Sequence, residues 1–296
     1  MSLEAFGKYL SLEKQYSVHT VKAYMRDLRQ FQEYCEQEHG ETALENMPYT
    51  VIRSWIISQM ESGRSNRTVN RKVASLKSYY KFLMRKGQLS ASPLSAHRAL
   101  KTDRKVEVPF SVDEMSKLLA QVPFEADFEG ARDQLLVELL YTTGIRRAEL
   151  IGIRIADLDL NAGTLRVLGK RNKQRIVPLV KSLLPLFNRY LALRHEAFPN
   201  RDIPFLFLSG SGNKIYETLV YRTISKYLGL VSEKAKKSPH VLRHTFATHM
   251  LNQGADMNSV KELLGHASLA STQVYTHNSI AELKRIHLNS HPRNKD

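Results

Sequence analysis

The stretch SPHVLRHTFATHM, residues 238–250, gathers side chains that could hold either a metal ion or a phosphate. On a helix, His240, Arg243 and His244 lie on one face, because residues three and four apart are neighbours there. Two histidines at that spacing occur in zinc sites, but the metalloprotease version has a glutamate directly after the first histidine, where Val241 stands here. Arg243 keeps a positive charge that repels a metal ion and binds two phosphate oxygens. The stretch therefore favours a phosphate site over a metal site, with histidines packed in a polar core as the alternative.

Two other segments supply arginines, an imidazole and a phenol. In TTGIRRAELIGI, Arg146 and Arg147 follow a glycine that ends an apolar helix, where an arginine could also cap the helix or pair with Glu149. In LLGHASLASTQVYTH, His266 follows a glycine and Tyr275 stands in a polar stretch. A lone tyrosine or histidine is usually a packing residue, but the cations and donors of these segments suit a phosphate as well.

The sequence offers no acidic cluster fit for Mg²⁺, so we expect neither a metal nor a cofactor. Asp157 and Asp159, in ADLDLNAG, come nearest and are typical of an ordinary loop. Cys35 is the single cysteine and cannot form an intramolecular disulfide, which suits a structural role in a reducing cytosol. The N-terminus lacks a signal-peptide pattern, and no run approaches the roughly 20 apolar residues of a membrane span. We therefore expect a soluble, cytoplasmic protein.

The net charge of +15 points to a polyanion, and its distribution is uneven. Residues 1–50 carry five Lys/Arg against eight Asp/Glu, whereas residues 51–106 carry thirteen against two. Lysines that only confer solubility would be interspersed with acids. The concentrated excess favours a nucleic-acid surface.

The predicted helix at residues 66–86 has two faces. Val69, Val73, Leu76, Tyr80 and Leu83 form an apolar stripe, and cations stand opposite it beside Ala74 and Ser78. Cations next to small side chains suit close approach to a phosphate backbone, although a charged helix face is often merely solvated. The DNA-binding candidates from this helix are Arg67, Arg71, Lys77, Lys81 and Arg85.

Apolar periodicity and turn residues predict a mainly α protein of two domains. Helices are expected at about 2–15, 18–38, 50–62 and 66–86, forming a helical domain at residues 1–88. A basic, Pro- and Ser-containing linker follows at residues 89–107, with the boundary near residue 105, and a second domain spans residues 108–296. Its first helix starts at a capping box, Ser111 with Glu114.

The second domain is predicted to be α+β, with mostly helices around one small β-hairpin. The hairpin is TLRVLG, the basic turn KRNK and QRIVPL, and FLFLS reads as a further short strand. We expect Trp55, Tyr79, Tyr80 and Phe82 to pack in the first domain. Tyr141, His244 and His249 are expected to be structural in the second.

Four segments in this order resemble the tyrosine site-specific recombinases, most closely the bacterial Xer type. They are GIRRAEL, GKRNKQRIVPL, HVLRHTFATH and LLGHASLASTQVYTH, and the resemblance covers nearly the whole chain. It implies an N-terminal four-helix, SAM-like core-binding domain, a linker and a catalytic domain. One such segment would be weak, but four in order are specific.

The resemblance assigns roles to individual residues. Arg146 and Arg243 correspond to the phosphate-clamping arginines, His240 and His266 to the paired imidazoles, and Tyr275 to the nucleophile that forms a 3′-phosphotyrosine. Lys170 corresponds to the hairpin lysine, the candidate acid for the leaving 5′-oxygen, with Lys173 as the runner-up. Glu149 corresponds to an acid that orients the first arginine, and Lys173 and Arg175 are expected to bind the DNA backbone. The family usually has a small or apolar residue where Arg147 stands, so whether Arg146 clamps the phosphate alone stays open.

The chemistry agrees with these roles. Fixed guanidiniums stabilise a phosphodiester transition state without a metal. A phenol with a pKa of about 10 forms a phosphate ester close in energy to the bond broken, so no nucleotide cofactor is needed.

The resemblance also implies an assembly and a cellular role. We expect a C-shaped clamp around duplex DNA, two protomers per site, and a homo- or hetero-tetramer, with a paralogous recombinase or an activating DNA translocase as candidate partners. The tail helix, beginning SIAE, is expected to dock on a neighbouring protomer. The implied role is resolution of chromosome or plasmid dimers, with a mobile-element integrase as the close alternative. A non-catalytic DNA-binding regulator and a histidine-dependent metallohydrolase are the alternatives from other classes.

Overall fold

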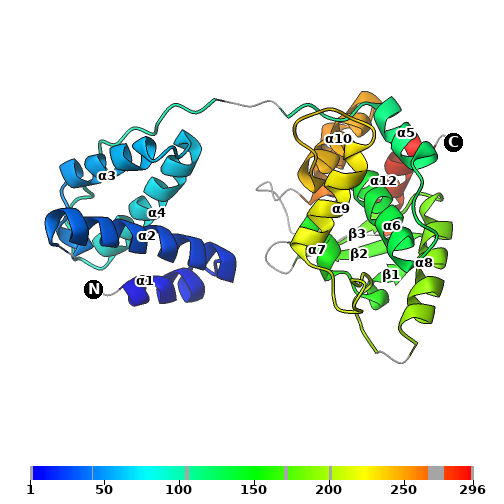
Figure 1. The fold of residues 1–296 in the computed structure, drawn as a ribbon, viewed down its shortest axis with the longest axis horizontal. Coiled ribbons are helices and arrows are strands. Elements are labelled where there is room, and N and C mark those ends of the chain that lie inside the picture. The colour runs from blue at the N-terminus through cyan, green and yellow to red at the C-terminus, as the bar shows by residue number, and fades with distance from the viewer. Residues whose placement is uncertain are drawn as a thin grey trace. The chain divides into compact units, whose positions relative to one another are not determined.

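A computed structural model describes residues 3–41, 43–103, 107–169, 173–199, 202–265 and 277–294. The chain divides into two compact units, Met1–Lys105 and Val106–Asp296, and Figure 1 draws the ribbon of both. Each unit has its own hydrophobic core. Within the described ranges, no helix has the length and apolar character that crossing a membrane requires.

The first unit is all-helical, as predicted. Its helices are α1 (Leu3–Lys8), continued by a π-helical turn at Tyr9–Glu13, α2 (Val18–His39), α3 (Tyr49–Glu61) and α4 (Asn66–Arg85), with a 3₁₀ turn at Leu44–Asn46. Ser17 and Ser65 cap α2 and α4 by accepting backbone N–H groups that have no partner within the helix. Gly40, with a φ of 66°, ends α2.

The aromatic residues of this unit pack in its core, which confirms that prediction. Trp55, Tyr79, Tyr80 and Phe82 are each at most 2% exposed. The stripe predicted on α4 is buried, and the buried face is wider than expected because it also includes Lys72. The Lys72 ammonium donates to the Gln30 and Gln59 side-chain oxygens, so its charge is solvated by amides inside the unit.

Much of the predicted linker is packed on the first unit. Leu94 is 2% exposed, and Leu89 and Leu100 pack against the same core. The Asn70 side chain receives the Leu100 N–H and donates to the Leu100 carbonyl, and Asn66 donates to the Lys101 carbonyl. The stretch up to Lys101 is therefore part of the helical unit, because its leucines have a core to join.

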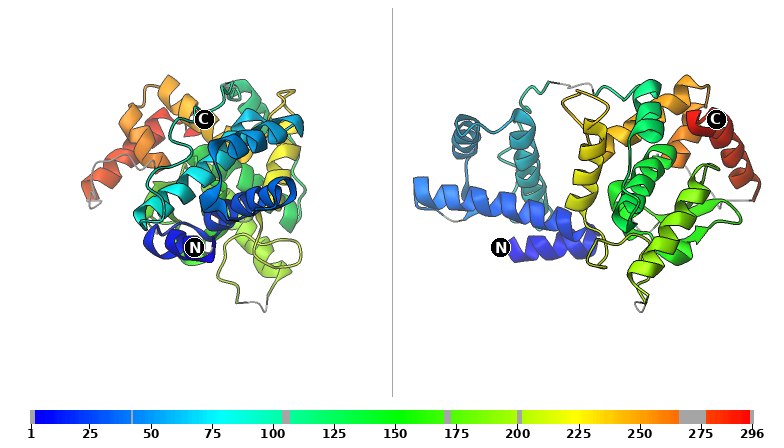
Figure 2. Two further views of the ribbon diagram at one scale, coloured as in Figure 1. Left: turned by 90° about the vertical axis from the view of Figure 1, so that its left-hand side faces the viewer. Right: turned by 45° about the vertical axis from the view of Figure 1, so that its right-hand side comes forward.

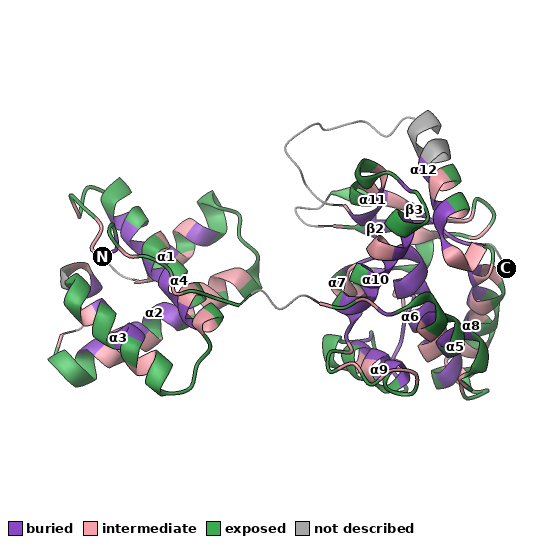
Figure 3. Cartoon of the chain, turned by 90° about the horizontal axis from the view of Figure 1, so that it is seen from above, coloured by how far each residue is buried: buried purple, intermediate pink, exposed green. Residues whose placement is uncertain are grey.

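The second unit consists of helices around a three-stranded antiparallel sheet (Figures 1 and 2). Its elements are α5 (Val112–Gln121), α6 (Phe128–Thr143), α7 (Arg147–Gly152), a 3₁₀ turn (Ile155–Asp157), β1 (Leu158–Asp159), β2 (Thr164–Leu168), β3 (Gln174–Pro178), α8 (Leu183–Ala197), α9 (Glu217–Gly229), α10 (Pro239–Asn252), α11 (Met257–Leu264), α12 (His277–Ser290) and a final 3₁₀ turn (Pro292–Asn294). Helix α6 contacts α8, α9 and α10 and is buried over most of its length, as Figure 3 shows.

The predicted hairpin is confirmed, with Leu165 opposite Val177 and Leu168 opposite Gln174. The predicted capping box of Ser111 and Glu114 is also present at the start of α5. The predicted strand at FLFLS is wrong in part: residues 205–208 are largely buried but form only isolated bridges, Arg154 with Phe205 and Leu208 with Lys214. The segment has apolar side chains suited to a strand, but no neighbouring strand to extend a ladder.

Candidate active site

Arg243 lies on α10, which starts at the Ser238 cap followed by Pro239. Its guanidinium is 8% exposed and donates to the Gly144 carbonyl (2.6 Å) and to the Leu264 carbonyl (2.7 Å). Burial, and then the charge of nearby Arg146, lower the pKa of Arg243 to about 10. The side chain is thus held rigidly and remains a cation at neutral pH.

Arg146 stands at the cap position of α7, directly after the left-handed Gly144 that ends α6 and Ile145. Its Nη1 donates to Glu149 Oε1 (2.7 Å), and its backbone N–H donates to Glu149 Oε2 (2.8 Å). Its Nη2 donates to the Gly265 carbonyl (3.1 Å). The side chain is 39% exposed, so this arginine is both fixed and accessible to a ligand.

Arg147 takes a different direction from its neighbour. Its Nη2 donates to Glu217 of α9 (2.6 Å), in a pair that is 35% and 60% exposed. Arg146 and Arg243, in contrast, donate to consecutive carbonyls at the end of α11, those of Gly265 and Leu264. The geometry therefore joins Arg146, and not Arg147, to Arg243.

Arg175 does not lie where we expected, on the DNA surface. It is 6% exposed on β3, and both its Nη atoms donate to the Glu149 carboxylate, at 2.9 and 2.8 Å. Bonds from Arg175 and Arg146 outweigh the desolvation of Glu149 and lower the pKa of its carboxyl to about 2. Strand alternation explains the burial, because Arg175 and Val177 point to the same inward face.

His240 projects from the start of α10 and is 76% exposed. Its Nε2 lies 3.7 Å from Glu107 Oε2, and Glu107 also pairs with Lys236. Partial desolvation, and then the charges of Lys236 and Arg243, lower the pKa of His240. His244 is exposed as well, so the prediction that it packs structurally is wrong.

Three predicted catalytic residues, Lys170, His266 and Tyr275, lie outside the described residues. Lys173 is exposed, and its carbonyl accepts the Gly169 N–H (2.7 Å) across the hairpin.

The cations predicted on α4 do not behave alike. Arg67 and Lys81 are exposed. Lys77 donates to the His97 carbonyl, and Arg85 lies 3.4 Å from Glu13 and over the Tyr9 ring. Arg71 is 44% exposed, and both its Nη atoms donate to Asp27, whose carboxylate is fully buried and needs that charge.

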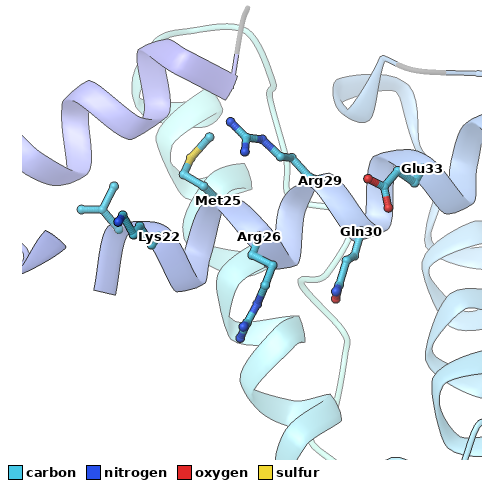
Figure 4. A pocket seen from close by; sticks show the side chains of 7 residues that line it. Lys22, Met25, Arg26, Arg29, Gln30 and Glu33 are labelled. Atoms are coloured by element: carbon cyan, nitrogen blue, oxygen red, sulfur yellow. The ribbon is translucent and has the colours of Figure 1, made fainter. Parts of the chain in front are cut away.

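A second group of cations was missed in the sequence. A groove of about 580 Å³ runs along α2, and Figure 4 shows side chains that line it. Lys22, Arg26 and Arg29 belong to this lining, with Gln30 and Glu33 beside them. The three cations are spaced four and three residues apart, and this spacing indicates that they lie on one face of the helix. These cations did not stand out in the charge count, because residues 1–50 carry more acidic than basic residues in total.

Two further titratable residues predicted to be structural, Tyr141 and His249, are buried in the second unit. Tyr141 bonds to His249 Nδ1 (3.0 Å), and His249 Nε2 donates to the Phe110 carbonyl (2.9 Å), as expected of buried packing residues. Asp157 ends a 3₁₀ turn and Asp159 ends β1, so the prediction of an ordinary loop is wrong in part, and each carboxylate accepts a nearby backbone N–H. Among the residues that the structure describes, no group of three His, Cys, Asp or Glu side chains could hold a metal ion.

Comparison with known proteins agrees with this architecture. Residues 109–282 match the phage integrase family and residues 3–87 match the phage integrase N-terminal SAM-like domain. The chain therefore belongs to the phage integrase family, an assignment that the four sequence segments anticipated. Its function is Xer-like site-specific recombination by an enzyme that cuts and rejoins DNA.

The relatives and the solved structures give the degree of similarity. The chain is 38% identical to tyrosine recombinase XerC of Chlorobaculum parvum, over 98% of this chain and 94% of that protein. It is also 38% identical to XerC of Staphylococcus carnosus, over 99% and 97%. The fold matches XerH bound to its palindromic difH substrate (TM-score 0.69, 22% identity, 96% and 82% of the chains). It matches the Tn1549 transposon integrase with transposon right end DNA equally well (TM-score 0.69, 21% identity, 97% and 99%).

Proposed function

We propose that Tyr275 is the nucleophile of this recombinase and that Arg146 and Arg243 clamp the phosphate it attacks. The observation that carries the proposal is the pair of fixed guanidiniums at the α11 end, one of which is partly open to solvent. Such a pair stabilises the charge that spreads over the phosphoryl oxygens in the transition state. Because the donors are already held by Glu149 and backbone carbonyls, little reorganisation is needed when DNA binds.

The remaining roles follow from the same chemistry. Attack by the Tyr275 phenol forms a 3′-phosphotyrosine and breaks the bond to the 5′-oxygen, which takes a proton from Lys170 as the general acid. His240 and His266 assist phosphate binding, and one of these imidazoles takes the proton that the attacking phenol loses. The lowered pKa of His240 favours its neutral form, which can both accept and donate a proton near pH 7.

We also propose that both units bind duplex DNA. Candidate backbone contacts are the exposed cations Arg67 and Lys81 of α4, Lys22, Arg26 and Arg29 of α2, and Lys173 of the hairpin. XerH was solved on its difH substrate and a lambda integrase dimer on a core site, which supports several protomers acting on one DNA site. Chromosomal DNA as substrate would place the protein in the cytoplasm.

The biological role that we favour is resolution of chromosome or plasmid dimers, because the cited relatives carry the name XerC. A paralogous recombinase and an activating translocase remain candidate partners within that role. An integrase of a mobile element is the second candidate, supported by the likeness in fold to the Tn1549 integrase. Location of the gene inside a mobile element would favour the second role.

The nucleophile is tested with a nicked suicide duplex that carries a binding site selected from randomised DNA. The wild type is expected to form a denaturant-resistant covalent adduct in EDTA, and Tyr275→Phe is expected to form none, because the phenol oxygen is the attacking atom. Tyr221→Phe, at a tyrosine that is 46% exposed on α9, is the matched control. An undiminished adduct in Tyr275→Phe would refute the assignment, and inhibition by EDTA would favour a metallohydrolase.

A further inference from the structure

Three consecutive carbonyls at the C-terminal end of α11 each accept a hydrogen bond from a different arginine. The pairs are Arg175 Nε with Leu263 (3.0 Å), Arg243 Nη2 with Leu264 (2.7 Å) and Arg146 Nη2 with Gly265 (3.1 Å). The last carbonyls of a helix lack donors within the helix and carry a negative partial charge. Side chains from β3, α10 and the start of α7 therefore meet at this end and hold it in place.

Two of the three arginines, Arg175 and Arg146, also share one partner, the Glu149 carboxylate. The two Nη atoms of Arg175 donate to the two Glu149 oxygens, and Glu149 Oε1 in turn accepts from Arg146 Nη1 (2.7 Å). Arg175 and Glu149 are both 6% exposed, so this bidentate pair is shielded from water and its geometry is well defined. The position of the Arg146 guanidinium consequently depends on the carboxylate that Arg175 fixes.

The local backbone is shaped to admit the Arg175 guanidinium. Gly265 has a φ of 63°, and a Cβ there would lie 2.9 Å from Arg175 Nη1. Only glycine allows both this backbone conformation and this close approach. Residue 266 follows directly in the chain, and Lys173 of the hairpin precedes Arg175 by two residues. Arg175 thus lies between the hairpin, the α11 end and the proposed phosphate clamp.

We propose that Arg175 is a positioning residue for DNA cleavage, acting through Glu149 on Arg146 and through the Leu263 carbonyl on the end of α11. This inference rests on the proposed function, because it takes Arg146 as a phosphate ligand. Arg175 does not bind DNA itself, since its buried guanidinium is directed to Glu149 and Leu263. A lysine cannot replace it, because one ammonium cannot donate to both carboxylate oxygens and to Leu263 in the same fixed plane.

The test compares Arg175→Lys with wild type on two suicide duplexes, one with a normal scissile phosphodiester and one with a neutral methylphosphonate. Single-turnover adduct formation on the phosphodiester is expected to fall about 10- to 100-fold, because a displaced Arg146 stabilises less transition-state charge. On the neutral methylphosphonate the loss is expected to stay below about 3-fold, since little charge needs stabilising there. The Kd for DNA should change less than about 2-fold, with an unchanged salt dependence.

Arg166→Lys is the matched control, because Arg166 lies on the neighbouring strand β2, is 50% exposed and pairs with Asp157. It should leave both rates near those of wild type. Equal losses on the two substrates, or no loss on either, would overturn the proposal. A weaker Kd with a shallower salt dependence would make Arg175 a DNA contact and would also overturn it.

If Arg175→Lys does not fold, as judged by circular dichroism, Gly265→Ala takes its place. The added methyl group would displace the guanidinium without removing it, and the same difference between substrates is expected. Failure of the wild type to form any adduct would refute the proposed function. A normal wild-type adduct with unaffected variants would refute the positioning role alone.

Discussion

Adjacent arginines in one short segment have opposite environments. Arg146 is bonded to Glu149 and Gly265 near Arg243, whereas Arg147 forms a surface pair with Glu217. Arg146 has an extended backbone at the cap position and Arg147 is the first helical residue, so the two side chains leave the chain in different directions. The departure from the family pattern at Arg147 therefore leaves the proposed phosphate clamp intact.

We predict that Arg146→Ala and Arg147→Ala differ strongly in DNA cleavage. Loss of Arg146 should lower single-turnover adduct formation by about 10²- to 10³-fold, the size of effect seen when one transition-state donor is removed. Loss of Arg147 should change it less than about 3-fold, because an exposed ion pair contributes little. The variants are compared on the same suicide duplex, and a larger effect at Arg147 would reverse the assignment.

Residue types and order were enough to predict the arginines of the site but not what each one touches. The family resemblance suggests a DNA contact for Arg175 beside Lys173, but strand alternation puts Arg175 on the inward face with Val177. The pairing of Arg71 with Asp27 was not predictable for a related reason, since this buried partner lies 44 residues away, and DNA binding by the exposed Arg71 stays a prediction. Charged side chains that are paired inside a protein depend on contacts distant in sequence, and a local pattern does not reveal them.

The helices were predictable because their signals are local. Ser65 and the apolar stripe mark α4, and Ser111 with Glu114 marks α5. In the single chain, Leu283 and Ile286 of the tail helix α12 join a cluster with Phe246 and Met250, and docking of this helix on a neighbouring protomer stays a prediction. Its apolar face needed a partner, and α10 of the same unit supplies one.

Buried imidazoles at the end of α12 make its docking sensitive to acid. His287 Nε2 donates to the Thr142 carbonyl (2.7 Å), and burial lowers the pKa of His287 to about 4. His291 is buried beside it with a pKa lowered in the same direction, near His249 and Arg293. An undocked histidine has a pKa near 6.5, so protons bind preferentially to the undocked form.

We predict that α12 loosens as the pH falls from about 6.5 toward 4, and that docking is at full strength above this window. The sign follows because lowered pKa values mean that the docked state holds fewer protons than the undocked state. Amide exchange of residues 284–290, corrected for the intrinsic rate, is the measurement. His287→Gln, whose amide can still donate to Thr142, should flatten the dependence, while His195→Gln at an exposed histidine of α8 should not. Exchange that is independent of pH in the wild type would contradict the prediction.

At the scale of the whole chain, the two units have separate hydrophobic cores and one natural reporter. The single tryptophan, Trp55, is fully buried in the first unit. Tryptophan fluorescence therefore follows that unit, whereas far-ultraviolet circular dichroism follows the helices of both. Separate cores allow each unit to unfold in its own transition.

We predict that core substitutions affect these two probes selectively. Leu135→Ala, at a fully buried position of α6, should destabilise the second unit by about 2–5 kcal/mol and shift the dichroism transition in urea while leaving the fluorescence midpoint unchanged. Leu76→Ala, fully buried in α4, should shift the fluorescence midpoint instead. A fluorescence midpoint that moves in Leu135→Ala would show that the units unfold together.

Residues 89–101 pack on the helical unit, so the linker between the two units is shorter than the predicted 89–107. Asn66 holds the Lys101 carbonyl, and Glu107 is already bonded within the second unit, so six peptide steps separate the two anchored points. Such a stretch spans at most about 20 Å. Once one unit has bound a duplex, the linker keeps the other unit near the same DNA. The effective local concentration of that second unit is on the order of millimolar. Two units that each bind DNA weakly would then give the whole protein a long residence time on DNA. A longer linker between the units would shorten that residence time.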